Sequence, residues 1–282
     1  MESTRMAYIS DKLDVVPRRR PWQAIAKAIG LMFAAYVIYG IATSPELAWE
    51  TVGSYLFNTL ILQGLLTAIQ LTAIIMLISI VLGGIVALMQ LSRSRFLQFA
   101  ASLYTWFFRG TPALVQLILW FNLAIFVRQI SLWVPFYGTV FTANTNDIMT
   151  PFVAAVTALS LHEAGYMAEI IRAGIKSVPP GQVEAAESLG MGKLHVLRRI
   201  VIPQAMRVII PPTGNETIGM LKSTSLVSTI AVPDILYQAQ QIYNRTFETL
   251  PMLIVVTVWY LFIVSILSVG QSYIEKYYGR GE

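Results

Sequence analysis

Long apolar segments with few charges recur along this chain of 282 residues. A helix needs roughly 20 residues to cross a hydrocarbon core about 30 Å thick. The segments of suitable length and apolarity are 23–43, 64–90, 100–127, 151–172 and 251–271. A further segment, 208–232, is polar and proline-containing, so we expect it to pack against protein rather than lipid. The sequence therefore predicts an all-α integral membrane protein with about six transmembrane helices.

Composition agrees with this class. Hydrophobic residues make up 56% of the chain and charged residues only 12%, whereas about a quarter of a soluble domain is charged. The apolar runs are continuous, while a transmembrane barrel needs alternating residues. One helix over 58–90 would be about 50 Å long, which is too long for one upright span. We therefore expect residues 45–58 to lie along the outer face of the membrane.

Lys and Arg predict the orientation, since they concentrate in cytoplasmic loops. They are frequent before the first apolar segment, at Arg5, Lys12 and 18–20, and again over 172–207. We therefore expect a multi-pass membrane protein with both termini in the cytoplasm. The net charge of +5 then indicates contact with anionic membrane lipid rather than nucleic acid. The first apolar run exceeds the 7–15 residues of a signal-peptide core, which favours a retained span.

The sequence predicts no catalytic residue, no metal site and no cofactor on this chain. It has no cysteine and two histidines, too few for a thiolate or histidine metal cluster. No phosphate-binding loop, dinucleotide fingerprint or nucleophile elbow is present, so no motif for ATP binding is found.

A charged, glycine-punctuated segment over 173–207 interrupts the apolar pattern. Proline at 179 and 180 should end the preceding span, and a short helix can follow with Glu184 and Glu187 near its N-terminal end. Gly190 and Gly192 should stop it.

A second helix should follow over 193–202, with an apolar stripe at Leu194, Leu197 and Val201. Pro203 should end it. Patterning leaves two interpretations open: an interfacial hairpin that packs on its own spans, or a helix pair that inserts into a partner's groove.

The residues of this segment resemble the EAA loop of ABC importer permeases. Glu184-Ala185-Ala186 is followed after three residues by Gly190, and nine residues later by 200–203, with Ile202 where the family usually has Leu. In that family the loop forms the coupling helix that docks on the ATP-binding subunit. The resemblance implies that loop 184–203 contacts a separate ATPase, which binds ATP and Mg. The contact residues implied are Glu184, Ala185, Ala186, Gly190, Met191 and Gly192.

Four further motifs resemble the polar amino acid uptake branch, of the histidine/glutamine type. They are 108–112 (FRGTP), 168–175 (AEIIRAGI), 214–216 (GNE) and 221–226 (LKSTSL). The resemblance covers about 53–275 and implies a type I-like permease domain there. Residues 1–52 would be a cytoplasmic arm with an extra transmembrane helix, and 276–282 a cytoplasmic tail. Ser223 departs from the Asp often found after the lysine of that branch.

The family resemblance implies a permease that forms the translocation pathway and is not itself an enzyme. Its partners would be an ATP-binding subunit, a second permease subunit, identical or a sister chain, and a periplasmic or tethered substrate-binding protein. Its cargo would be a polar amino acid and its location the bacterial inner membrane. Separately from the resemblance, Glu163 favours a cationic amino acid as the substrate. The alternatives are an ion-gradient-driven secondary transporter or channel without an ATPase, and a structural membrane subunit that transports nothing.

Charges near the bilayer centre point to a substrate site, because they are costly unless they face a cavity or pair. Glu163 and Lys222 each lie roughly 20 Å along a helix from opposite membrane faces. Lys222 can bind an amino acid's carboxylate and Glu163 its ammonium or a cationic side chain. The alternative is that the two residues pair with each other.

Neighbouring polar residues allow two roles as well. Ser223, Thr224 and Ser225 can form a polar wall or bond back to their own helix. Asn215 and Glu216 follow prolines at 211 and 212, which should break the helix as in many transport sites; Asn215 can equally bond between spans. His162 should point away from Glu163 and serve in packing.

Overall fold

The computed structural model describes residues 21–278. The chain forms two units that divide between Ala48 and Trp49. In the first unit, helix α2 (Pro21–Thr43) precedes a short 3-10 helix, η2 (Pro45–Leu47). Within this unit the side chains of 25–43 are exposed and mostly apolar, as a lipid-facing helix requires. The basic arm expected over 1–20, and residues 279–282 of the expected tail, lie outside the described residues.

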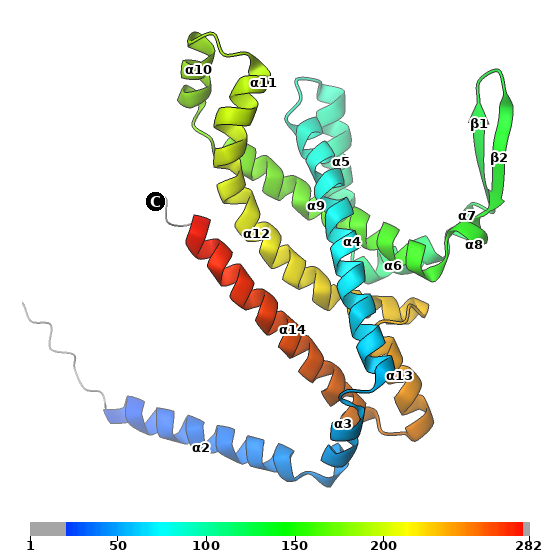
Figure 1. Cartoon of the computed structure of the whole chain (residues 1–282), viewed down its shortest axis with the longest axis vertical. Helices are drawn as coiled ribbons and strands as arrows, with labels where there is room; N and C mark the ends of the chain where they lie inside the picture. The colour runs from blue at the N-terminus through cyan, green and yellow to red at the C-terminus, as the bar shows by residue number, and fades with distance from the viewer. Residues whose placement is uncertain (1–20, 279–282) are drawn as a thin grey trace, which may run out of the picture. The chain divides into compact units, whose positions relative to one another are not determined.

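The second unit is mostly helical, and its elements can be followed in Figure 1. Its first helices are α3 (Trp49–Tyr55), α4 (Thr59–Gln90), α5 (Arg95–Gly110), α6 (Ala113–Phe121) and α7 (Leu123–Phe126). Then come strands β1 (Gln129–Val134) and β2 (Gly138–Asn144) and helices α8 (Thr145–Ile148), α9 (Pro151–Lys176), α10 (Pro180–Ser188) and α11 (Lys193–Val196). The unit ends with the π-helix η3 (Leu197–Val201), α12 (Ile202–Ser223), the 3-10 helix η4 (Thr224–Ile230), α13 (Ile235–Thr246) and α14 (Thr249–Tyr278).

Glycines let α9 pack closely against α4 and α12. A Cβ on Gly83 of α4 would lie 2.6 Å from the Cβ of Met167 in α9. A Cβ on Gly174 of α9 would lie 2.3 Å from Cγ1 of Ile209 in α12. Membrane helices often approach in this way at small residues. These contacts make α9 the central helix of the unit.

A second core joins the start of α4 to α3, α13 and α14. Gly64 of α4 faces the backbone where η4 leads into α13, since a Cβ there would lie 2.7 Å from the Cα of Ile235. The carboxylate of Asp234 begins α13 by accepting hydrogen bonds from the N–H groups of Leu236 (3.2 Å) and Tyr237 (2.9 Å). Figure 1 shows α3 and α13 at one end of this unit and α10 and α11 at the other.

Three helices among residues 21–278 are long and apolar enough to cross a membrane: 25–43 within α2, α4 and α14. Helix α4 runs unbroken for 32 residues, about 48 Å at 1.5 Å per residue, so it must tilt or extend beyond the hydrocarbon. The expected single helix over 100–127 is wrong. The chain leaves the helical conformation at Thr111 and Pro112, because the ring of Pro112 disfavours a helical residue before it.

Two predictions about prolines are also wrong. Pro203 does not end a helix, and Pro211 and Pro212 do not break one, because α12 continues from Ile202 to Ser223. The π-helical turn η3 ends at Val201, two residues before Pro203, and changes the hydrogen-bond pattern of the preceding turn. The carbonyl of Pro211 accepts a hydrogen bond of 2.7 Å from Nε2 of Gln271 in α14, so a neighbouring helix stabilises the proline-containing turn.

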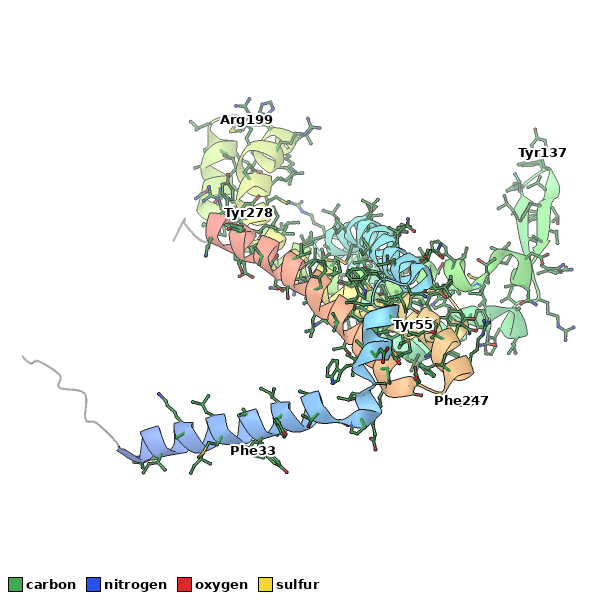
Figure 2. The ribbon with its side chains drawn as sticks, turned by 60° about the horizontal axis from the view of Figure 1, so that its bottom comes forward. Phe33, Tyr55, Tyr137, Arg199, Phe247 and Tyr278 are labelled. Atoms are coloured by element: carbon green, nitrogen blue, oxygen red, sulfur yellow. The ribbon has the colours of Figure 1, made fainter. Side chains whose placement is uncertain are left out.

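The antiparallel hairpin β1–β2 was not predicted. Its tip has positive φ at Phe136 (72°) and Gly138 (75°), and a β-bulge lies beside Leu132 and Trp133. Both views show it projecting away from the helices, next to α7 and α8 (Figures 1 and 2). The all-α prediction therefore holds for the helical body but misses this element.

Candidate functional site

The loop after α9 folds into a short helix with a well-defined stop. Pro180 occupies the start of α10, where a missing N–H costs no hydrogen bond. Gly190 has φ of +77°, and its N–H donates to the carbonyl of Glu187 (2.9 Å) while that of Met191 donates to Ala186 (3.1 Å). This pair of bonds is a Schellman motif, in which glycine supplies the left-handed residue. Gly190 stops the helix as predicted.

Glu184 and Glu187 lie outside the first turn of α10, so the prediction that they sit near its N-terminal end is wrong. The helix begins at Pro180, four residues before Glu184. Its inner face includes buried Ala186, which packs with Val196 and Val201, and Met191 joins them from the turn. The helix is therefore fixed to the rest of the loop through its apolar side.

The opposite face of this loop is open. Glu184, Ala185, Gly190 and Gly192 are exposed, and the side chain of Leu189 is 84% exposed. A large apolar residue at a rigid turn suits insertion into a partner's groove. We call this face, formed by Glu184, Ala185, 188–190 and Gly192, the coupling surface.

A second group of polar residues surrounds the middle of α9. Glu163 is only 4% exposed, and its Oε1 has no hydrogen-bond partner among the described residues. Glu216 of α12 is near enough to repel it electrostatically. A buried carboxylate without a partner is costly, so this position requires a proton or a cation.

Lys222 does not form an ion pair with Glu163: within the described part of the chain the only ion pair joins Glu169 and Arg172. Lys222 is exposed on the last turn of α12. The alternative prediction, that Glu163 and Lys222 pair with each other, is therefore wrong for this structure. Arg109, which sequence reasoning did not select, lies near Glu216 and places its guanidinium 5.2 Å from the ring centre of Tyr166.

The three hydroxyl residues after Lys222 bond back to their own helices. Ser223 donates to the carbonyl of Gly219, Thr224 to that of Leu221 and Ser225 to that of Lys222. This is the second of the two roles considered for them. With these bonds formed, the three hydroxyl groups do not form a polar wall.

Asn215 is exposed and donates a hydrogen bond of 3.4 Å to Glu275 of α14. This bond between helices is the alternative role considered for Asn215. Glu216 is half-buried. His162 has a partner in Gln116, whose Nε2 lies 3.1 Å from Nδ1 of the histidine, in keeping with a packing role.

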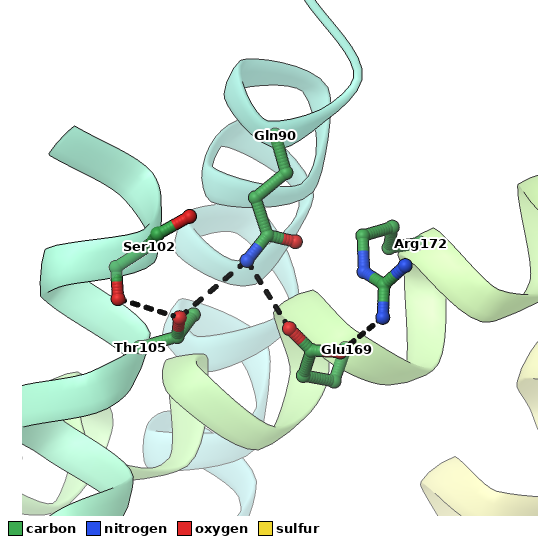
Figure 3. Close-up of polar contacts among 5 residues, drawn as sticks. All are labelled: Gln90, Ser102, Thr105, Glu169 and Arg172. Atoms are coloured by element: carbon green, nitrogen blue, oxygen red, sulfur yellow. Dashed lines mark hydrogen bonds and ion pairs between the residues drawn. The ribbon is translucent and has the colours of Figure 1, made fainter. Parts of the chain in front are cut away.

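A polar cluster joins α4, α5 and α9, as Figure 3 shows. Nε2 of Gln90 donates to Oε1 of Glu169 at 3.1 Å and approaches Oγ1 of Thr105 at 3.5 Å. Arg172 holds the other oxygen of Glu169 at 2.5 Å. Glu169 and Arg172 lie on the part of α9 that leads into α10, whereas Gln90 belongs to α4 and Thr105 to α5. The cluster therefore connects the end of α9 that precedes α10 to the helices α4 and α5.

Comparison with known proteins decides the family. A model described as binding-protein-dependent transport system inner membrane component matches residues 79–278. The chain belongs to this family. It is 43% identical over 270 residues to the arginine transport system permease protein ArgU of Corynebacterium glutamicum, covering 95% of this chain and 84% of that protein.

Other members of the family are also similar. The histidine/lysine/arginine/ornithine transport system permease protein HisM of Escherichia coli is 33% identical over 205 residues, covering 71% of this chain and 83% of HisM. A solved structure described as an amino acid ABC transporter with histidines is 35% identical with a TM-score of 0.65, covering 78% of this chain and 94% of that one.

Family membership confirms the main sequence prediction. The chain is a permease subunit of an ABC importer, an inner-membrane component whose ATPase is a separate subunit. The family implies an ATPase, a substrate-binding protein and a second permease subunit as partners. The gradient-driven transporter or channel considered as an alternative is not supported.

Proposed function

We propose that this permease imports cationic amino acids. The observation that carries the proposal is Glu163, buried and without a cationic partner, with a second carboxylate, Glu216, close to it. Arg109 lies near Glu216, so the carboxylate of Glu163 is the one left without a cation, and its low-dielectric surroundings favour a bound cation. Relatives named for arginine and for histidine, lysine, arginine and ornithine support the same substrate class.

In this proposal Glu163 and Glu216 bind the cationic side chain of the substrate, and Lys222 binds its carboxylate. Charge-assisted hydrogen bonds of this kind are stronger than neutral ones. Ser223, Thr224, Ser225 and Asn215 complete the wall of the site when their present bonds open in another state of the transport cycle. Each of these four side chains is a candidate contact, secondary to the charged groups.

The coupling surface is proposed to dock on the ATPase. Glu184, Ala185, Leu189, Gly190 and Gly192 face outward, while Ala186 and Met191 pack on the inner side and fix the helix to the rest of the loop. ATP binding closes the ATPase dimer, and α10 passes the motion into α9 and α12. Only a difference in contact between the two nucleotide states can supply this coupling free energy.

We propose that residues 53–275 form the permease core, with an added helix and arm over 1–52 and a tail over 276–282. Two such cores, from identical or sister chains, frame the pathway. The loop 173–207 and both termini lie in the cytoplasm, since Lys and Arg concentrate there. The binding protein delivers substrate to the opposite face.

The experiment is uptake of arginine, lysine and glutamine by the reconstituted importer with its binding protein. Glu163→Gln should lower arginine and lysine uptake at least about tenfold, because removing one partner of a buried charge pair costs 2–5 kcal/mol, and should affect glutamine much less. Glu184→Gln is the matched control, since a coupling defect lowers the uptake of all three amino acids alike. Equal losses for all three amino acids in Glu163→Gln would contradict the proposed site.

A further inference from the structure

The hairpin β1–β2 carries a feature that transport does not explain. No charged residue lies between Arg128 and Asp147, although this stretch connects helices outside the predicted spans. Soluble loops and exposed strand edges normally carry charges, which prevent edge-to-edge aggregation. An uncharged, exposed hairpin therefore needs an apolar or interfacial environment.

The side chains of the hairpin divide into two faces. Ile130, Leu132, Phe141 and Ala143 stand opposite one another in two pairs on one face. On the other face Ser131 faces Thr142, with their hydroxyl oxygens 3.2 Å apart. Strand residues alternate between faces, so one side of the hairpin is apolar, whereas the other has hydroxyl groups at Ser131 and Thr142 and carries Trp133, paired with Thr139, near the tip.

The tip adds large aromatic residues. Phe136 is fully exposed, Tyr137 is 82% exposed and Trp133, near the tip, is 64% exposed. Figure 2 shows Tyr137 at the end of the hairpin, away from the helices of its own unit. Trp and Tyr are enriched where protein meets the headgroup region of a bilayer, because their rings are apolar and their N–H or O–H groups are polar.

The hairpin is also joined to the helices by short connections. Only residues 127–128 separate it from α7, and α9 begins at Pro151, shortly after α8. Ile125, Phe126 and Val127, directly before the hairpin, are exposed and apolar, so the segment that leads into the hairpin also suits an apolar environment. Arg128 at its base is exposed and suits lipid phosphates.

We propose that the hairpin lies in the membrane interface, with its apolar side and tip toward the acyl chains and Ser131 and Thr142 toward water. It belongs to the leaflet opposite the coupling surface, because the two are joined to opposite ends of α9. The free strand edges keep it out of the hydrocarbon core, where unpaired backbone groups cost several kcal/mol each. The hairpin thus anchors the end of α9 near which the substrate enters.

The absence of cysteine allows a direct test by spin labelling. Single cysteines at Tyr137, at the tip, and Ser131, on the polar side, would be labelled in the assembled importer. The importer would be reconstituted in vesicles of phosphatidylethanolamine and phosphatidylglycerol. Collision rates with oxygen, which enters lipid, and with a water-soluble nickel chelate would be compared, with and without the binding protein.

We expect oxygen collisions to dominate at position 137 and nickel collisions at 131, unchanged by the binding protein. With the label at 137, Phe136→Glu should raise nickel collisions several-fold, while Phe136→Leu should not. Nickel access at 137 that falls when the binding protein is added would instead make the hairpin a docking arm for that protein. Protection of 137 from both reagents would mean burial against protein. Either result overturns the proposal without affecting the proposed transport function.

Discussion

Replacing Gly190 by alanine tests whether the turn after α10 must keep its conformation to bind the ATPase. Gly190 has φ of +77°, and a Cβ placed on it meets no atom within 4 Å. Alanine there introduces backbone strain and no steric clash. Gly192 offers a matched control, because its surroundings are equally open and its φ of −65° is one that any residue adopts.

The expected effect follows from the cost of the left-handed conformation. For a residue with a Cβ, this conformation costs about 1–2 kcal/mol of free energy relative to glycine, which corresponds to a factor of about 5–30 in an equilibrium constant. The unbound turn can relax from this strain, whereas docking restores the original geometry. The cost should therefore appear as weaker binding of the ATPase. Asparagine tolerates this conformation better than alanine, so Gly190→Asn should fall between the two.

The assay is a titration of purified ATPase onto the permease held in lipid nanodiscs. We expect the Kd to rise about 5–30-fold for Gly190→Ala, less for Gly190→Asn, and to stay unchanged for Gly192→Ala. Unchanged affinity for Gly190→Ala, or the same loss for both alanine variants, would refute the role assigned to this turn.

Other predictions concern packing and capping. Gly83→Ala should destabilise the α4–α9 contact by about 1–3 kcal/mol and lower the Tm of the purified protein, whereas Gly84→Ala should not, since its nearest neighbour would lie 4.0 Å away; equal Tm values would contradict the packing described. Asp234→Ala removes the acceptor for two N–H groups at the start of α13 and should cost about 1 kcal/mol. Asp234→Asn should lower the Tm much less than Asp234→Ala. If both variants lower the Tm equally, capping is excluded as the cause.

The long apolar helices were predictable because the bilayer length fixes their size. The run 251–271 lies inside α14, and 64–90 inside α4. The break at Thr111–Pro112 was missed because apolar residues continue on both sides of it. In α12 the opposite error arose: Pro211 suggested a break, but Gln271, sixty residues away, supplies a hydrogen bond to its carbonyl.

The start of α10 after Pro179 and its stop at Gly190 were predictable from local signals, since these residues act on the backbone where they stand. The continuation of the helix through Pro203 was not. The surroundings of Glu163 were not, because burial and the approach of Glu216 depend on how α9 and α12 pack. The hairpin was missed for a different reason. Its alternation of apolar and polar residues is short, and a run that includes Leu132, Trp133 and Phe136 resembles part of an apolar loop.

The most direct test of an ATP-driven importer coupled through this loop is ATPase activity of the reconstituted complex with its binding protein. Wild type would be compared with Glu184→Lys and Lys222→Ala across a panel of amino acids. We predict that arginine stimulates hydrolysis in the wild type, that Glu184→Lys abolishes the stimulation, and that Lys222→Ala weakens it. If no ATPase co-purifies with the permease and uptake continues with an ion gradient alone, the account is contradicted.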